Sequence, residues 1–204
     1  MTIWSREFAY ALGLLATDGN LSPDRRHINF TSKDYDLVQT FKKCLGLNNK
    51  IGVKPRGGEK EKKYFQIQFG DVNFYEYAEK LGITSKKSKT IGEVKVEDKY
   101  FADFLRGCID GDGSIGAYRH PESKNPQLRI RIYSASPKFL EWLKSKVVKL
   151  YKIDSGWIET KKDGMGVLVY AKTDSLILLG KIYYNGVVYK LERKYNTAKP
   201  FLRA

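Results

Sequence analysis

Two short segments of the chain carry residues whose types and spacing could bind a metal ion. Each places an aspartate and a glycine directly after a run of apolar residues, as Asp18-Gly19 and as Asp112-Gly113. Aspartate is disfavoured by about 0.3–1 kcal/mol at the C-terminal end of a helix, where the backbone dipole is negative. One Asp-Gly pair alone is most often an ordinary turn that leads into a strand. Two pairs, 94 residues apart, favour a shared site, because a cation held between two carboxylates would remove this cost.

The segments before the two aspartates are predicted to be buried helices that pack on each other. Residues 7–17 are apolar on nearly all sides, which is typical of a buried helix. A glycine lies five residues before each aspartate, Gly13 in the first segment and Gly107 in the second. Because glycine costs about 1 kcal/mol inside a helix, these positions indicate the close approach of another backbone. We therefore expect a pseudo-twofold axis between the helices, with both aspartates at the same end.

The two segments resemble the LAGLIDADG motif, which is named after its own sequence. Residues 105–113 (Leu-Arg-Gly-Cys-Ile-Asp-Gly-Asp-Gly) follow the motif closely, and residues 11–19 follow it more loosely. The resemblance to LAGLIDADG homing endonucleases covers nearly the whole chain, in the single-chain form with two motif copies. Ala16 stands where the motif has its first acidic residue, so the corresponding Asp110 is expected to be structural.

This resemblance implies a site-specific endonuclease that hydrolyses one phosphodiester in each strand of a long, asymmetric duplex DNA site. It implies that Asp18 and Asp112, with the backbone carbonyls of Thr17 and Gly111, bind Mg²⁺ together with the scissile phosphates and water. Oxygen ligands of this kind suit a hard divalent cation. Mn²⁺ is an alternative metal, and Ca²⁺ is expected to support DNA binding without cleavage.

The resemblance also implies an active-site lysine at the end of each repeat. Lys87 and Lys194 match that lysine and would stabilise the charge of the transition state or organise the attacking water. Lys86 is an alternative to Lys87 in this register.

The pattern of apolar residues predicts an α+β fold made of two similar halves. Alternation predicts strands at residues 26–32, 50–56, 64–70, 128–134, 156–161 and 165–172. Helical periodicity and end signals predict helices at residues 7–17, 33–45, 72–81, 99–111, 136–150 and 174–184. Three strands are located in this way in each half, and we expect each half to be an αββαββα repeat with a four-stranded antiparallel sheet that has one apolar face and one polar, basic face. We expect the first repeat to span residues 1–90, a linker residues 91–98 and the second repeat residues 99–204.

The charge distribution favours a polyanionic partner that contacts both halves. The chain carries a net charge of +14, with 17 basic and 12 acidic residues up to Glu97 and 20 basic and 11 acidic residues after it. Two sheets whose strands each span roughly 23 Å would form a saddle long enough for on the order of 15 base pairs. The side chains expected to read bases or hold phosphates are Arg25, Arg26, Asn29, Lys54, Arg56, Gln66, Gln68, Arg129, Arg131, Tyr133, Lys161 and Lys162.

Other classes of protein fit the sequence less well. No apolar run approaches the roughly 18–20 residues of a membrane span, and the N-terminus lacks the layout of a signal peptide. With only two cysteines, we expect a reducing intracellular compartment, the cytoplasm or nucleoid or an organelle matrix. The resemblance to the single-chain form with two motifs implies a monomer. Two alternatives stay open: an RNA maturase that binds intron RNA, and a DNA-binding relative that has lost cleavage.

Overall fold

The computed structural model describes residues 4–55, 63–119 and 126–202 of the chain. The first half contains α1 (Arg6–Thr17), β1 (Gly19–Leu21), β2 (His27–Ser32), α2 (Tyr35–Cys44), β3 (Gly52–Lys54), β4 (Tyr64–Gly70), α3 (Val72–Lys80) and the 3₁₀ turn η1 (Lys87–Lys89). The second half contains η2 (Asp98–Tyr100), α4 (Phe101–Asp112), β5 (Gly113–Tyr118), β6 (Gln127–Ser134), α5 (Pro137–Tyr151), β7 (Trp157–Thr160), β8 (Gly166–Ala171), α6 (Lys172–Ile182), α7 (Glu192–Ala198) and η3 (Lys199–Phe201). None of the described helices is both long and apolar enough to span a bilayer.

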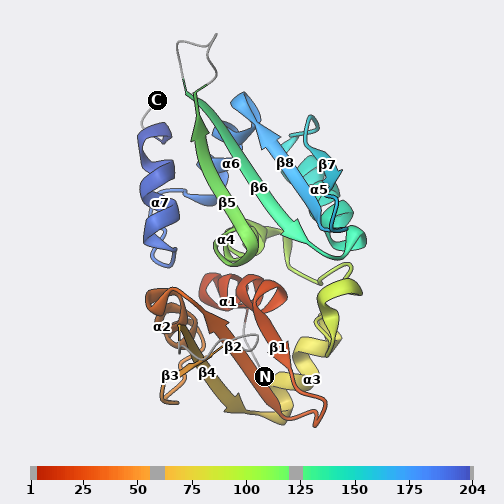
Figure 1. Ribbon diagram of the computed structural model, residues 1–204, viewed down its shortest axis with the longest axis vertical. Helices are drawn as coiled ribbons and strands as arrows, with labels where there is room; N and C mark the ends of the chain where they lie inside the picture. Colours follow the sequence, from red (N-terminus) through yellow and green to blue (C-terminus); the bar gives the residue numbers. More distant parts are fainter. Residues whose placement is uncertain (1–3, 56–62, 120–125, 203–204) are drawn as a thin grey trace.

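Each half builds a four-stranded antiparallel sheet, which confirms the predicted fold class. The strand orders are β1-β2-β4-β3 and β5-β6-β8-β7, the same order twice. Figure 1 looks onto the open faces of both sheets, with helices behind them and the two halves stacked along the long axis. The strand β2 places Ile28 and Phe30 in the core, where Phe30 stacks on Phe41 of α2 at 4.5 Å between ring centroids. The alternation read in the sequence therefore sorts apolar side chains to the helix side and polar ones to the open side.

The helices α1 and α4 lie side by side at the centre of the molecule, between the two sheets (Figure 1). A Cβ atom added to Gly13 would lie 2.1 Å from the carbonyl oxygen of Phe104, and one added to Gly107 would lie 2.3 Å from that of Tyr10. Both distances are far below van der Waals contact, so neither position accepts a side chain without separating the helices. The predicted close approach of the two helix backbones is confirmed.

The structure differs from the sequence-based expectation in four elements. The strands β1 and β5 were not located in the sequence, because β1 has only three residues and β5 contains two glycines, so neither shows clear alternation. The strand β8 was expected to have a polar, basic open face, but it is apolar on both faces, and Val167 and Val169 are each only 1% exposed. These valines lie opposite long side chains of the neighbouring strands, among them Arg131 and Trp157, so the expectation of alternation fails there. The helix α7 was not predicted, because its seven residues contain no apolar periodicity.

Candidate active site and nucleic-acid interface

The two aspartates lie at the adjoining C-terminal ends of α1 and α4. Asp18 is the C-cap residue of α1, whose other end is capped by the Ser5 hydroxyl, which accepts a hydrogen bond from Phe8 N at 3.1 Å. Asp112 is the last residue of α4. A Cβ atom on Gly111 would lie 2.1 Å from Thr17 Oγ1 and 3.3 Å from Asp18 Oδ2, so the two helix ends touch. The tight crossing at the motif glycines thus brings together two carboxylates from residues 94 positions apart.

A buried lysine is directed at each of these helix ends. The Lys87 ammonium donates hydrogen bonds to the carbonyl oxygens of Thr17, at 3.3 Å, and of Gly19. The Lys194 ammonium donates to the carbonyl oxygens of Ile109 at 2.6 Å, Asp110 at 2.8 Å and Gly111 at 3.4 Å. The free carbonyls of a helix C-terminus attract a cation, which accounts for this placement.

Burial changes the chemistry of both ammonium groups. Lys87 and Lys194 are each only 5% exposed. Burial lowers the pKa of both to about 8; the carboxylates of Asp112 and Asp18 oppose this for Lys87, and that of Asp110 does so for Lys194. Lys86, the alternative in the sequence register, is exposed and has a positive φ of 57°. The geometry therefore pairs Lys87, rather than Lys86, with the end of α1.

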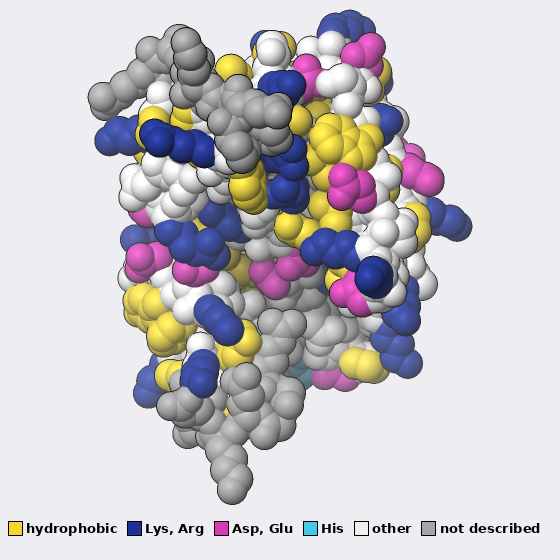
Figure 2. Space-filling view, turned by 45° about the horizontal axis from the view of Figure 1, so that its top comes forward, with side chains coloured by type: hydrophobic (Ala, Val, Ile, Leu, Met, Phe, Trp, Pro, Cys, Tyr) yellow, Lys and Arg dark blue, Asp and Glu magenta, His cyan; other side chains and the backbone are white. Residues whose placement is uncertain are grey.

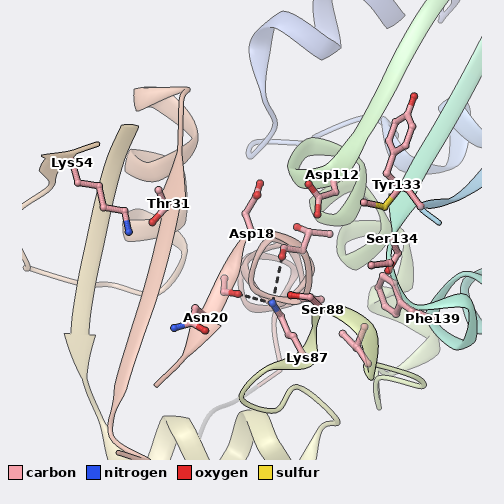
Figure 3. A pocket seen from close by; sticks show the side chains of 16 residues that line it. Asp18, Asn20, Thr31, Lys54, Lys87, Ser88, Asp112, Tyr133, Ser134 and Phe139 are labelled. Atoms are coloured by element: carbon pink, nitrogen blue, oxygen red, sulfur yellow. Dashed lines mark hydrogen bonds between the residues drawn. The ribbon is translucent and has the colours of Figure 1, made fainter. Parts of the chain in front are cut away.

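A cleft of about 470 Å³ opens at the helix ends, between the two sheets. Figure 3 shows Asp18 and Asp112 directed into it from adjacent helices, with Lys87 beside the end of α1. Residues of both sheets line it, among them Asn20, Thr31, Lys54, Tyr133 and Ser134. A substrate held in this cleft would contact both halves of the chain.

The oxygen atoms at the C-terminal ends of α1 and α4 are ligands of the kind that a hard divalent cation prefers. The residues that line the cleft offer two carboxylates, Asp18 and Asp112. At the same helix ends lie the carbonyl oxygens of Thr17 and Gly111, which also accept hydrogen bonds from Lys87 and Lys194. Among the residues that the structure describes, no group of three or more His, Cys, Asp or Glu side chains gathers into a metal cage. A cation here would complete its coordination with water or with substrate oxygens, as Mg²⁺ commonly does.

The open face of the first sheet carries amide side chains, as predicted. In the register of β2 and β4, Asn29 lies opposite Gln68, and Thr31 lies opposite Gln66. The Gln66 amide donates a hydrogen bond to Asn29 Oδ1, while Gln68 is exposed. Lys54 lies at the end of β3 and lines the cleft. This face presents donors and acceptors suited to adenine edges.

The open face of the second sheet carries cationic and aromatic side chains instead. The guanidinium groups of Arg129 and Arg131 lie over the ring of Tyr118, at 5.8 and 4.8 Å from its centroid, and Arg131 Nη1 donates to the Tyr118 hydroxyl at 2.5 Å. The Lys161 ammonium lies 4.5 Å from the ring centroid of Tyr133. Tyr118 was not among the residues expected to contact DNA; its position at the end of a strand that follows the second motif is the signal that could have found it.

The remaining predicted DNA contacts lie in connecting turns or outside the described residues. Arg25 has a φ of 57° in the turn between β1 and β2 and forms an ion pair with Glu79 of α3 at 2.7 Å. Arg26 follows it and is exposed, and Lys162 is exposed in the turn between β7 and β8. Arg56 lies outside the described residues. In Figure 2 basic side chains are spread over the visible face of the molecule, above and below a group of acidic side chains near the middle.

Comparison with known proteins agrees with this architecture. The sequence profile of the LAGLIDADG-like domain matches residues 5–82. The chain is similar to the solved structure of the homing endonuclease I-WcaI bound to its DNA recognition sequence, with a TM-score of 0.68 and 9% identity over 97% of this chain and 88% of that chain. The chain has the two-repeat LAGLIDADG fold.

Two further solved structures share this LAGLIDADG fold. The N-terminal LAGLIDADG domain of DUF199/WhiA is 20% identical with a TM-score of 0.57, over 95% of this chain and 88% of that chain. I-DmoI, in complex with DNA and Mn, is 17% identical with a TM-score of 0.57, over 89% of this chain and 98% of that chain. No curated protein sequence matches the chain.

The LAGLIDADG motif of the second repeat contains an acidic residue, Asp110, where the first repeat has Ala16. Asp110 is 1% exposed, and its Oδ2 atom accepts hydrogen bonds from the Tyr10 hydroxyl at 2.8 Å and from Leu191 N at 2.9 Å. Burial raises the pKa of Asp110 to about 6, against the lowering effects of Lys194, Tyr10 and the Leu191 amide. Its side chain bonds within the protein interior, away from the cleft, as expected for a structural acid.

Proposed function

We propose that the protein is a site-specific endonuclease that cuts both strands of a long, asymmetric duplex DNA site with the help of a divalent cation. The observation that carries the proposal is the pair Asp18 and Asp112, held at touching helix ends in a cleft that both sheets line. A buried lysine at each helix end gives both halves the same set of chemical groups. Two equivalent sets on one chain suit two equivalent reactions, one on each DNA strand.

The aspartates and the neighbouring carbonyl groups would bind the cation and orient water. Asp18, Asp112 and the carbonyl oxygens of Thr17 and Gly111 would hold Mg²⁺ or Mn²⁺. A bound divalent cation supplies Lewis-acid polarisation of the phosphate and lowers the pKa of water. Each carboxylate would also orient water toward a phosphorus atom, because it projects from a helix end fixed by close packing.

The two lysines would stabilise charge that develops on the phosphate. Their ammonium groups are pre-positioned by hydrogen bonds to helix-end carbonyls, so no reorganisation is needed at the moment of reaction. With a pKa of about 8, Lys87 and Lys194 are mostly protonated at neutral pH.

The two open sheet faces would read different sequences. Amide side chains such as Asn29 and Gln68 suit adenine, and the guanidinium groups of Arg129 and Arg131 suit guanine. The phosphate contacts would come from lysines near the cleft and the turns, such as Lys54 and Lys161. Since the two faces differ, the preferred site would be asymmetric. Structures of this fold bound to DNA, I-WcaI and I-DmoI among them, support the choice of duplex DNA as partner.

The test is cleavage of a plasmid library that carries randomised sites. The wild-type protein is incubated with Mg²⁺, with Ca²⁺ or with EDTA, beside the variants Asp18→Asn and Asp112→Asn. We expect double-strand cuts at one long motif with Mg²⁺ only, and loss of these cuts in both variants. Lys87→Met should lose the double-strand cuts, while Lys86→Met, a matched change at the exposed neighbour, should retain them.

A different result would favour a binding module. If no sequence is cut under any condition while a duplex or an intron RNA is bound with nanomolar affinity, the protein is a DNA-binding relative or an RNA maturase of this fold. Cleavage that survives EDTA would contradict the role given to the carboxylates.

A further inference from the structure

The side chain of Asp110 joins three segments that are far apart in the sequence. Asp110 belongs to α4, its Oδ2 atom binds the hydroxyl of Tyr10 in α1, and the same atom binds the backbone N–H of Leu191. Leu191 is the N-cap residue of α7. Asp110 therefore fixes the point at which α7 begins.

The backbone of the same residue holds the active-site lysine of the second half. Lys194 lies in the first turn of α7, and its ammonium donates to the carbonyl oxygen of Asp110 at 2.8 Å. The segment of residues 191–194 is thus bound at both ends by one residue, by its carboxylate at Leu191 and by its carbonyl at Lys194. Two attachment points fix the direction of the short helix turn between them, and with it the position of the ammonium.

The first half holds its lysine without such a residue. Ala16 occupies the position equivalent to Asp110, and Lys87 lies in the single 3₁₀ turn η1. The chain after Lys87 is held by a different contact, in which the Ser136 hydroxyl donates to the carbonyl oxygen of Ile91 at 2.5 Å. The first half shows that a motif helix of this fold forms with alanine at this position.

The second half needs an anchor more than the first. The connection from the end of α3 to Lys87 runs from residue 80 to 87, whereas that from the end of α6 to Lys194 runs from residue 182 to 194. A longer connection restricts its end less, and closing it costs more conformational entropy. The hydrogen bond from Leu191 N to Asp110 offsets the greater conformational freedom of this longer connection.

Stability alone does not account for a carboxylate at this place. Asp110 is 1% exposed, and its Oδ1 atom has no hydrogen-bond partner among the residues that the structure describes. A buried carboxylate with one oxygen unsatisfied is costly compared with an apolar residue. Because Asp110 costs stability and binds residues 191–194, its presence is better explained by its effect on the position of Lys194.

We propose that Asp110 is the positioning residue for Lys194, and that it thereby controls the cutting of one DNA strand only. The inference rests on the proposed endonuclease function. Lys87 serves the other strand and is held by other contacts, so removal of the Asp110 carboxylate leaves that strand unaffected. The two halves of the chain therefore position the lysines for the two DNA strands through different contacts.

The test resolves the two strands on a supercoiled plasmid that carries the site selected by the wild-type protein. We expect Asp110→Ala to slow one strand by at least about tenfold, because a displacement of about 1 Å at a catalytic group has effects of this size or larger. The slowed strand should be the one that Lys194→Met also slows, with no further loss on that strand in the double variant. Tyr10→Phe is the matched control, since it removes the other hydrogen bond to Asp110 and keeps the bond to Leu191; it should cut each strand at the wild-type rate. Equal slowing of both strands by Asp110→Ala, or of neither, would overturn the inference.

A second measurement does not depend on cleavage. In amide hydrogen exchange, Asp110→Ala should speed the exchange of residues 191–198 and leave that of residues 87–91 unchanged. If Asp110→Ala does not fold, Asp110→Asn is measured in both assays, with the same expected direction. A wild-type protein that cuts no plasmid refutes the proposed function, while unchanged exchange at residues 191–198 refutes the positioning role.

Discussion

Replacement of Gly13 by alanine tests the central contact of the molecule. The added Cβ atom would lie 2.1 Å from the Phe104 carbonyl oxygen, 2.9 Å from Cys108 N and 3.0 Å from the Cα atom of Gly107. All three are backbone atoms, so no side-chain rotation can relieve the overlap. Helices α1 and α4 must move apart by more than about 1 Å to restore van der Waals contact.

The expected magnitude follows from two opposing effects. Overpacking a tight interface costs about 1–3 kcal/mol, and the upper end applies because the clash is with backbone. The better helix propensity of alanine returns at most about 1 kcal/mol. The net loss in the free energy of unfolding is about 2 kcal/mol, which lowers the melting temperature of a chain of this size by about 4–8 °C.

The assay is thermal unfolding followed by circular dichroism, with Gly180→Ala as the matched control. Gly180 lies in the exposed part of α6, and a Cβ atom there would meet nothing within 4 Å. Gly180→Ala should therefore raise the free energy of unfolding by about 0.5–1 kcal/mol. If Gly13→Ala melts at or above the wild-type temperature, the reasoning about the helix contact is wrong.

Three further predictions concern side chains outside this contact. Arg131→Ala should relax the base preference at one position of the cleaved site, where a bidentate contact is worth about 1–3 kcal/mol; an unchanged profile in a site selection would contradict this. Burial raises the pKa of the Cys44 thiol to about 12, so its alkylation by iodoacetamide should be slow at pH 8. Rapid labelling of the native protein at pH 8 in mass spectrometry would refute the shift. Arg193 binds Asp34 across the two halves at 2.9 Å but is 60% exposed, so Arg193→Ala should lower the free energy of unfolding by no more than about 1 kcal/mol in urea titration. That difference should shrink further in 1 M salt, and a larger, salt-independent loss would point to a role beyond the exposed ion pair.

Local sequence patterns were enough to predict the duplication, most of the elements and the pair of aspartates, whereas the pair of lysines came from the resemblance to the LAGLIDADG family. Helical periodicity located α1 and α4, and alternation located strands such as β2 and β4, because both signals depend only on neighbours a few residues apart. The glycines at positions 13 and 107 predicted a close helix contact, since glycine inside a helix is costly unless another backbone needs the space.

The three-dimensional arrangement of the chain determines which side chains meet. It placed Lys87 rather than Lys86 against the end of α1, because neighbouring residues of a turn direct their side chains to different sides. It brought Asp110 to Leu191, 81 residues later, and it placed Tyr118 against two arginines of the next strand. Contacts of this kind join segments with no local pattern in common, so they follow from the packing of the whole chain rather than from any stretch of it.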